Sequence, residues 1–346
     1  MKKKRAVLLT VSAAGLICAL LSPVTVSRAI RDALRLCADT LVPSLFPYMV
    51  FTSLLAKALT AEAITVSGSR KNRTGRLIFV LGALSGYPTG AKTVVELYRA
   101  GQLTKEESHR LLFFSCNAGP AFIFGVIGSL YASLPVCVAI MIIHLGSAWL
   151  LGLMLPKKNT VSDKGSAHKA VPLPPFSECL LDAVQSAVHT LLKIAGLVCV
   201  FSLITAVERK VLLQFHAFLP VLSIFTELAS GCALLAGSSL SWALKFTVTA
   251  AAVSFGGLCV LLQTASVLSG SGLSLRHYAA GKLLQAVISA AAAWPVSKLL
   301  ATSLPVASVA TTNLHLSPWP WALFSAATVL AVFLQFSSSN FSGHEL

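Results

Sequence analysis

The chain has 346 residues, of which 55% are hydrophobic and 11% are charged, and its mean hydropathy is +0.79. A water-soluble core of this size could not bury so much apolar surface, so the composition excludes an ordinary globular protein and indicates a polytopic membrane protein. The formal net charge of +15 does not indicate nucleic-acid binding, because the basic residues form short clusters between apolar runs.

Apolar segments of roughly 20 residues can cross the hydrocarbon core of a bilayer. We predict an all-α protein with eight transmembrane helices, near residues 6–22, 41–57, 111–131, 134–155, 191–207, 246–269, 281–302 and 319–336. The first segment follows the basic residues 2–5 and therefore also resembles a secretory signal. Because Arg28 interrupts the small-x-small pattern expected of a cleavage site, an uncleaved helix is the preferred interpretation and a cleaved signal the alternative.

Four other segments do not fit the pattern of a simple span. Segments 77–91 and 219–239 are apolar but short or rich in Gly and Ser, and we predict that they are re-entrant or broken helices. In segments 26–41 and 176–191 apolar residues recur every three or four positions, which predicts interfacial amphipathic helices.

The two amphipathic segments resemble each other, which indicates an internal duplication. Asp32 matches Asp182 and Thr40 matches Thr190 at a constant offset. We therefore divide the chain into an N-terminal helix, a first repeat, a cytoplasmic linker, a second repeat and a C-terminal helix with a tail. Their boundaries are 1–25, 26–156, 157–175, 176–302 and 303–346.

The basic clusters predict how the repeats are oriented. Placing residues 2–5, 70–76, 157–169 and Arg276 on the cytoplasmic side, with a cytoplasmic N-terminus, makes the two repeats inverted copies. The charged residues 208–210, which fall on the outer side, fit this arrangement least well.

The motif SGYPTG in the first repeat must interrupt a helix. Non-helical backbone at membrane depth occurs only where protein or a water-filled cavity surrounds it, and secondary transporters place their binding sites at such interruptions. The candidate binding residues here are Ser85, Gly86, Tyr87, Pro88, Thr89 and Gly90.

Lys92 follows this motif directly. A lysine at the bilayer centre would cost about 2.5–3.5 kcal/mol, so Lys92 either contacts a solute or counter-ion or extends to the cytoplasmic interface beside Glu96 and Arg99.

Glu227 is a carboxylate in an otherwise apolar run, three residues before Ser230 and Gly231. It is a candidate for proton or cation coupling, for hydrogen bonding to a polar substrate, or for a structural contact with a lysine or hydroxyl.

A second interruption, SCNAGPAF, contributes Asn117, Gly119 and Pro120. Its counterpart in the second repeat contributes Ser254 and Gly256, and Gln263 follows them. Amides inside spans often hydrogen-bond only to a neighbouring helix, and this alternative stays open for Asn117 and Gln263.

Cysteine and histidine spacing gives no sign of a metal or cofactor. The eight cysteines form no C-x-x-C pair and the eight histidines show no ligand spacing, so we expect neither a metal site nor a cofactor. Tyr87, Lys92 and Glu227 give little basis for an intramembrane enzyme, and we predict that the protein is not one.

These motifs carry a resemblance to a known family. SGYPTGAKTVVELYRAG, NAGPAFIFG and FGGLCVLLQTASVLSGSGLS resemble segments of the sporulation integral membrane proteins of the YlbJ type, within the nucleoside recognition or Gate domain family. The resemblance covers residues from about 26 to 300, although Ala118 stands where relatives often have Ser. It implies a multi-pass protein of the bacterial cell or forespore membrane, with a domain similar to part of the concentrative nucleoside transporters.

Two functions follow from the motifs and the resemblance. The first is a transporter or gated permeation unit that moves a small polar, nucleoside-like solute by alternating access at the broken helices. The alternative is a non-transporting structural or assembly protein of the forespore envelope, needed for spore cortex or coat formation. The expected partners are the lipid bilayer, the solute, a second copy of the chain or other sporulation membrane proteins, and no nucleic acid.

Overall fold

The computed structural model describes residues 2–65, 70–99, 101, 103–155, 174–211 and 219–303. These residues form helices and no strand, so the predicted all-α class is confirmed for them. The helices are α1 (Lys2–Leu21), α2 (Pro23–Leu36), α3 (Val42–Thr65), α4 (Arg70–Ser85), α5 (Thr89–Arg99), α6 (Lys105–Phe114), α7 (Gly128–Tyr131), α8 (Leu134–Met154), α9 (Phe176–Val211), α10 (Leu219–Thr226), α11 (Leu228–Ala236), α12 (Trp242–Phe255), α13 (Gly257–Leu268) and α14 (Leu275–Ser303). Two π-helical segments, Cys37–Leu41 and Ala121–Ile127, precede α3 and α7.

Several helices are long and apolar enough to cross a membrane. Among the described residues these are Leu134–Met154, Phe176–Ala206, Trp242–Leu268 and Leu275–Ala301, and the bent pair Pro23–Leu41 with Leu45–Leu55 would be a fifth. The described residues thus support an integral membrane protein with four or five spans, and they do not confirm the predicted eight. The predicted span 319–336 lies outside the described residues, as does nearly all of the linker 157–175 and of the C-terminal region 303–346.

Four predicted segments differ from the helices observed. The amphipathic segment 176–191 and the span 191–207 form the single helix α9, because no Gly or Pro separates them. The predicted span 111–131 is interrupted after Phe114, at the Asn117–Pro120 motif, and resumes as a π-helical segment and α7. The predicted span 246–269 is divided at Gly256, whose φ of 88° ends α12.

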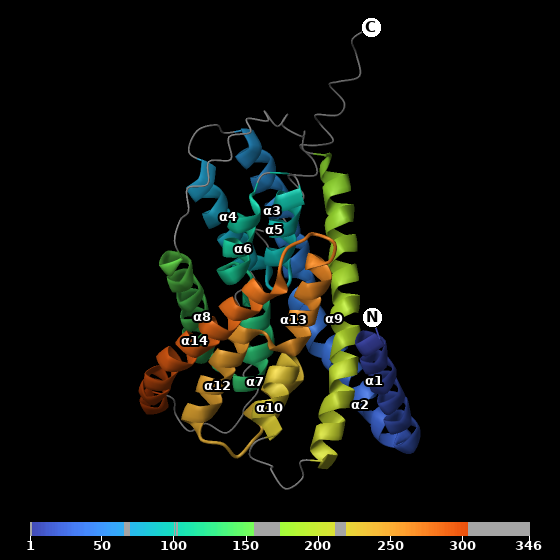
Figure 1. Ribbon diagram of the computed structural model, residues 1–346. Helices are drawn as coiled ribbons and strands as arrows, with labels where there is room; N and C mark the ends of the chain where they lie inside the picture. Colours follow the sequence, from blue (N-terminus) through green and yellow to red (C-terminus); the bar gives the residue numbers. More distant parts are fainter. Residues whose placement is uncertain are drawn as a thin grey trace.

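The order of elements is the same in both halves. A helical hairpin, α4 with α5 and α10 with α11, is followed by a second interrupted helix and then by a long helix, α8 or α14. Figure 1 shows α4 and α5 near one end of the molecule and α10 near the other, while α9 runs the length between these ends. The inverted relation between the halves stays a prediction.

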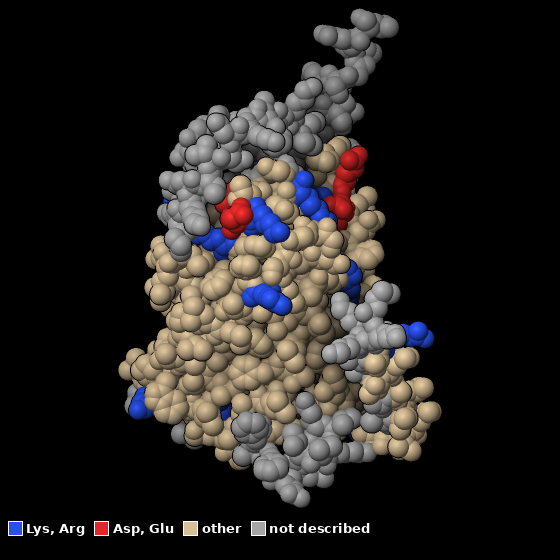
Figure 2. Space-filling model, in the orientation of Figure 1, with Lys and Arg blue, Asp and Glu red and all other residues tan. Residues whose placement is uncertain are grey.

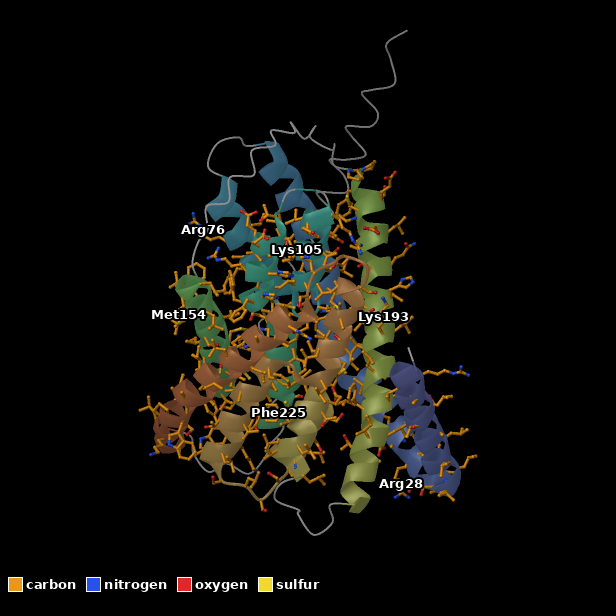
Figure 3. All side chains as sticks on the ribbon, viewed as in Figure 1. Arg28, Arg76, Lys105, Met154, Lys193 and Phe225 are labelled. Carbon is orange, nitrogen blue, oxygen red and sulfur yellow. The ribbon has the colours of Figure 1, made fainter. Side chains whose placement is uncertain are left out.

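Charged and apolar side chains are separated on the surface. On the face drawn in Figure 2, most of the charged side chains gather toward the end that carries α4, α5 and α6, and uncharged side chains cover a broad band beside it. In Figure 3, Arg76 and Lys105 lie toward this end and Phe225 toward the other. Large apolar side chains are exposed on the long helices, among them Ile142, Leu192 and Leu299. Such exposed apolar surface suits contact with lipid.

Close backbone packing joins α14 to α6. α14 packs against α12, α6 and α8. A methyl group added at Gly281 would lie 2.0 Å from the carbonyl oxygen of Phe113, so only glycine allows α14 to cross the end of α6 at this point. The crossing brings the next residue, Lys282, beside the interruption that follows α6.

Candidate functional site

The first hairpin is joined to the second interruption through glycines. A methyl group added at Gly82 or Gly90 would lie 1.9 Å or 2.6 Å, respectively, from the carbonyl oxygen of Ser115. At the turn, Gly86 has a φ of 77°, and a methyl group there would lie 3.1 Å from the backbone nitrogen of Gly119. The two interruptions of the first half therefore touch through bare backbone.

Glycines also permit close backbone contacts in the second half of the chain. A methyl group at Gly231 of α11 would lie 2.1 Å from the Cα of Ile224 in α10, and one at Gly257 would lie 3.3 Å from the carbonyl oxygen of Phe225. The halves meet where the Tyr87 hydroxyl donates a 2.6 Å hydrogen bond to the carbonyl oxygen of Val253. Four helix breaks thus form one connected centre.

A buried polar network lies beside this centre. The Nζ of Lys282 donates to Oδ1 of Asn117 at 3.2 Å and to Oε1 of Gln285 at 2.7 Å. The Nε2 of Gln285 donates to the same Asn117 oxygen at 3.2 Å and to the carbonyl oxygen of His144 at 2.9 Å. These four side chains are all 0% exposed. Every hydrogen bond in the group therefore forms away from bulk solvent. In such surroundings a hydrogen bond is electrostatically stronger, and the loss of a partner is more destabilising.

His144 connects the network to a row of hydroxyl groups. Its Nε2 accepts a 2.9 Å hydrogen bond from the backbone N–H of Ala118, so Nε2 carries no proton and the neutral ring carries its proton on Nδ1. Nδ1 lies 2.9 Å from Oγ of Ser254, which lies 2.7 Å from Oγ of Ser289. Ser289 in turn lies 2.9 Å from Ser147. The row joins α8, α12 and α14.

Lys282 has no ion-pair partner among the acidic residues that the structure describes. Its Nζ lies 5.4 Å from the centre of the Tyr87 ring, a cation–π distance, and its two hydrogen-bond acceptors are neutral amides. A buried charge without a counter-charge is destabilising unless other interactions offset it, and intramembrane ionisable side chains usually serve function.

Several residues predicted from the sequence lie at this centre. Asn117 and Ser254 belong to the polar network, and the backbone of Gly86, Gly119 and Gly256 forms the contacts between breaks. The remaining members of the SGYPTG motif surround the first turn: Ser85, Tyr87, Pro88, Thr89 and Gly90.

Other predicted residues lie away from the network. Pro120 begins the π-helical segment after the second break. Gln263 is buried in α13, and its Nε2 donates to Sγ of Cys259 at 3.4 Å.

Glu227 caps a helix. It is 3% exposed, and its carboxylate accepts hydrogen bonds from the backbone N–H groups of Ala229 and Ser230, at 3.0 Å and 2.6 Å, and from the Ser230 hydroxyl. These are the free donors at the start of α11, where a negative charge is favoured. The contacts explain how a carboxylate can be buried in this apolar run without a lysine partner.

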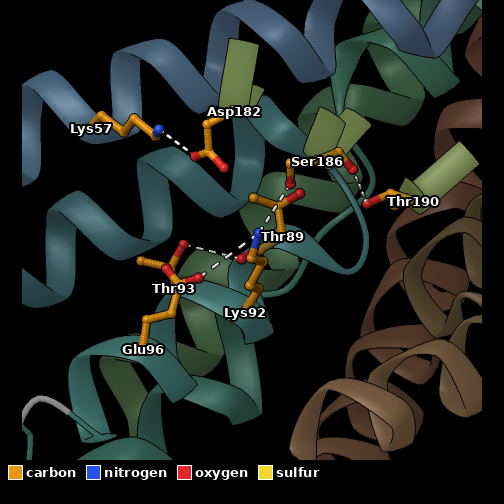
Figure 4. A network of polar contacts seen from close by, with 8 residues as sticks. All are labelled: Lys57, Thr89, Lys92, Thr93, Glu96, Asp182, Ser186 and Thr190. Carbon is orange, nitrogen blue, oxygen red and sulfur yellow. Dashed lines mark hydrogen bonds and ion pairs between the residues drawn. The ribbon is translucent and has the colours of Figure 1, made fainter. Parts of the chain in front are cut away.

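Lys92 lies outside the centre, on the surface of α5. Its side chain is 51% exposed, and Nζ lies 3.0 Å from Oγ of Ser186 in α9 and 3.9 Å from the Glu96 carboxylate. Figure 4 shows this contact beside the ion pair that joins Lys57 of α3 to Asp182 of α9. These polar contacts of Lys92 and Lys57 join α5 and α3 to the first turns of α9.

Five residues of the network and its row of hydroxyl groups were not among the sequence candidates: Lys282, Gln285, Ser289, His144 and Ser147. A signal for three of them was present, because Lys282, Gln285 and Ser289 recur at spacings of three and four and so form a polar stripe along the apolar segment 281–302. His144 is the one histidine in a long block without Asp, Glu, Lys or Arg.

The centre is closed in this structure, since the residues of the network are buried. An open pocket of about 470 Å³ lies elsewhere, on α2, and is lined by Ile30, Arg31, Leu34 and Arg35 among others. In the part of the chain that the structure describes, no three His, Cys, Asp or Glu side chains converge to form a metal site.

Comparison with known proteins supports the resemblance seen in the motifs. The chain is 23% identical over 306 residues to the sporulation integral membrane protein YlbJ of Bacillus subtilis (strain 168), and the match covers 76% of this chain and 75% of that protein. No protein-family model matches the chain, and no solved structure matches it significantly. The chain is therefore a homologue of a sporulation integral membrane protein of the YlbJ type, as its motifs indicated.

Proposed function

We propose that the protein is a carrier or gated permeation unit for a small polar solute, and that the solute binds where the four helix breaks meet. Broken helices offer unpaired backbone groups at membrane depth, and secondary transporters use such groups at corresponding positions of two repeats. The interruptions after Ser85 and Phe114, and those at Glu227 and Gly256, support this proposal, since each ends a helix and they come in the same order in the two halves of the chain.

One observation carries the proposal: the fully buried Lys282, with Asn117 and Gln285, at the junction of the halves. Apolar side chains would fill the same space with less loss of hydration free energy, so a network of this kind has no advantage for packing alone. It has an advantage when a polar solute takes part in it.

Alternating access supplies the mechanism. α4 and α5 lie toward one end of the molecule and α10 toward the other (Figure 1), and the hairpins contact the centre through glycine backbone as well as through apolar side chains. The mechanism requires one hairpin to separate from the centre while the other keeps it closed. The closed structure described above is then the occluded state of the cycle.

The proposal places this transport in sporulating cells, where the homologue acts as an integral membrane protein, and nucleoside-like compounds are the first solutes to examine. A structural or assembly role in the forespore envelope is the competing function. It requires the fold but no passage of water or solute to the breaks.

Cysteine accessibility separates these functions. Ser85 is suited to replacement because it is 8% exposed and its hydroxyl has no hydrogen-bond partner. In a variant without the native cysteines, Ser85→Cys should react with a membrane-impermeant thiol reagent from at least one side of a proteoliposome. Ser271→Cys in the turn before α14 is the control for aqueous exposure, and Leu258→Cys, on an exposed apolar position of α13, is the control for lipid exposure. A Ser85→Cys variant that stays as unreactive as Leu258→Cys, with every candidate solute present, would contradict the carrier.

A further inference from the structure

Two buried hydroxyl groups near the network lack a well-formed hydrogen bond. Tyr278 and Thr264 are both 0% exposed, and although Oη of Tyr278, Oγ1 of Thr264 and the Cys116 thiol are close neighbours, neither hydroxyl has a partner at full hydrogen-bond distance and angle. Buried hydroxyls are rarely left in this condition, because each has given up its hydrogen bonds to water. Two of them in one place indicate that a further group can bind there.

Both hydroxyls belong to the surroundings of Lys282. Tyr278 lies one helical turn before Lys282 on α14 and therefore on the same face of that helix. Tyr278 and Thr264 neighbour the thiol of Cys116, which in turn lies within electrostatic reach of the Lys282 ammonium. The Tyr87 ring borders the same region. We call the region formed by Lys282, Tyr278, Thr264, Cys116 and Tyr87 the lysine compartment.

When protonated, Lys282 gives the lysine compartment one positive charge, and none of the acidic residues that the structure describes forms an ion pair with it. Of the three N–H groups of Lys282, two donate to the neutral amides Asn117 and Gln285, and Nζ faces the ring of Tyr87. Asn117 directs its own Nδ2 away, toward the carbonyl oxygen of Phe114 at 2.9 Å. The surroundings therefore solvate the ammonium with dipoles and leave its net charge uncompensated.

We propose that the lysine compartment binds an anionic oxygen group, a carboxylate or a phosphate, of the transported solute. Lys282 balances its charge, and the hydroxyls of Tyr278 and Thr264 donate hydrogen bonds to its oxygen atoms. The inference rests on the carrier function and adds the chemical class of the solute. A cation is repelled by Lys282, and a neutral solute leaves the charge unbalanced.

Matched pairs of compounds test this class. Purified full-length protein in lipid nanodiscs is exposed to uridine 5′-monophosphate or uridine, and to galacturonate or galactose, with inorganic phosphate and acetate as minimal anions. Thermal unfolding is recorded, because a ligand that binds only the folded state raises the unfolding temperature. We expect stabilisation by the anionic member of at least one pair and none by its neutral partner. The phosphate and carboxylate pairs distinguish the two anionic groups. Equal effects of charged and neutral members, or no effect of any anion, would overturn the inference.

Variants assign the effect to the compartment. Lys282→Met should weaken binding of the effective anion by at least about tenfold, since a charge-assisted hydrogen bond is lost, and Lys282→Arg should restore part of it. Lys298→Met, which removes an exposed lysine of the same helix, should bind as the wild type does. Anion binding unchanged in Lys282→Met would exclude the compartment as the site.

Tyr278→Phe provides a readout that a purely structural residue would not give. It removes a hydroxyl that lacks a well-formed hydrogen bond, so the unliganded protein should unfold at a higher temperature while anion affinity falls several-fold. A variant that binds anions normally would remove Tyr278 from the site.

The outcomes for solute class and for transport are separable. If Ser85→Cys reacts with the thiol reagent but only neutral compounds bind, the carrier function is supported and the anion-binding inference is contradicted. If Ser85→Cys does not react from either side, the carrier function itself is contradicted.

Discussion

Lys282 and Asn117 are 165 residues apart in the sequence, and the Nζ of one lies 3.2 Å from the side-chain oxygen of the other. The contact joins α14, from the second half, to the interruption that follows α6 in the first half. A lysine of α14 is thus held by an amide of the segment that follows α6, next to the close contact of Gly281 with the Phe113 backbone. The effect of this contact on stability and on anion binding can be measured by substituting either residue.

Asn117 can be changed in two opposite ways. Asn117→Ala removes an acceptor shared by Lys282 and Gln285 and should lower stability by about 1–3 kcal/mol. Asn117→Asp places a carboxylate beside the ammonium, so it should unfold at a higher temperature than Asn117→Ala and should no longer be stabilised by anions. Thermal unfolding with and without the anion measures both. If Asn117→Asp destabilised as much as Asn117→Ala, Lys282 would not carry an uncompensated charge.

Gly82 tests the packing of the first hairpin. Gly82→Ala places a methyl group 1.9 Å from a backbone oxygen and should prevent the native hairpin, with loss of more than about 3 kcal/mol or of folded protein altogether. Gly146→Ala is the matched control, since Gly146 is in α8 and no atom lies within 4 Å of an added methyl group. The control should gain roughly 0.5–1 kcal/mol from helix propensity. Yield of monodisperse protein and its unfolding temperature distinguish the variants; equal behaviour would refute the close contact.

Glu227 should contribute to stability through its cap. Glu227→Ala is expected to cost about 1–2 kcal/mol, while Glu227→Asn, with a side chain that also caps helices, should cost less. Ser230→Ala removes one of the donors to the carboxylate and serves as the control for that contact. If Glu227→Asn and Glu227→Ala lowered the unfolding temperature equally, helix capping would not explain the contribution of Glu227 to stability.

His109 predicts how stability depends on pH at the charged end. Its Nε2 accepts a 3.0 Å hydrogen bond from the backbone N–H of Ser274, and its ring stacks on His277 at 4.1 Å. Burial lowers the pKa of His109 below 6.5, and His277 and Lys105 add to the shift, while Glu106 opposes it. The unfolded chain then holds this proton more tightly than the folded chain.

The contribution of His109 to stability is therefore present above pH 6.5 and is lost as the pH falls through 6.5 toward the lowered value. His109→Gln should lose less stability on acidification than the wild type. His189→Gln, at an exposed site on α9, should follow the wild type. Unfolding temperatures from neutral to mildly acidic pH provide the comparison, and parallel curves for His109→Gln and the wild type would exclude this contribution.

The helix breaks could be predicted from the sequence because their causes are local. Clustered Gly and Pro at residues 86–90 and 119–120, and paired Gly at 256–257, favour helix interruptions, and the structure has interruptions at each, whereas the isolated Pro47 and Pro295 lie within helices. The capping box of Thr104 and Glu107, another local pattern, begins α6.

The number of spans and the centre of the site could not be predicted in the same way. Apolar composition does not show whether a segment such as 246–269 is straight or divided, nor that 176–191 continues into the next segment. The role of Lys282 depends on a contact with Asn117 that only the packed fold creates. The position of Lys92 directly after a helix break makes it a candidate site residue, whereas in the structure its side chain lies on the surface.

The native Cys116 gives the most direct test of whether water and anions reach the centre. It is 0% exposed, precedes Asn117 and belongs to the lysine compartment. In a variant that keeps Cys116 as its only cysteine, we expect reaction with impermeant thiosulfonates from at least one side of the membrane. The reaction should be faster with a sulfonate reagent than with a trimethylammonium reagent of similar size, because Lys282 attracts the first and repels the second. A Cys116 that reacts with neither reagent from either side, with and without anions, would contradict the account.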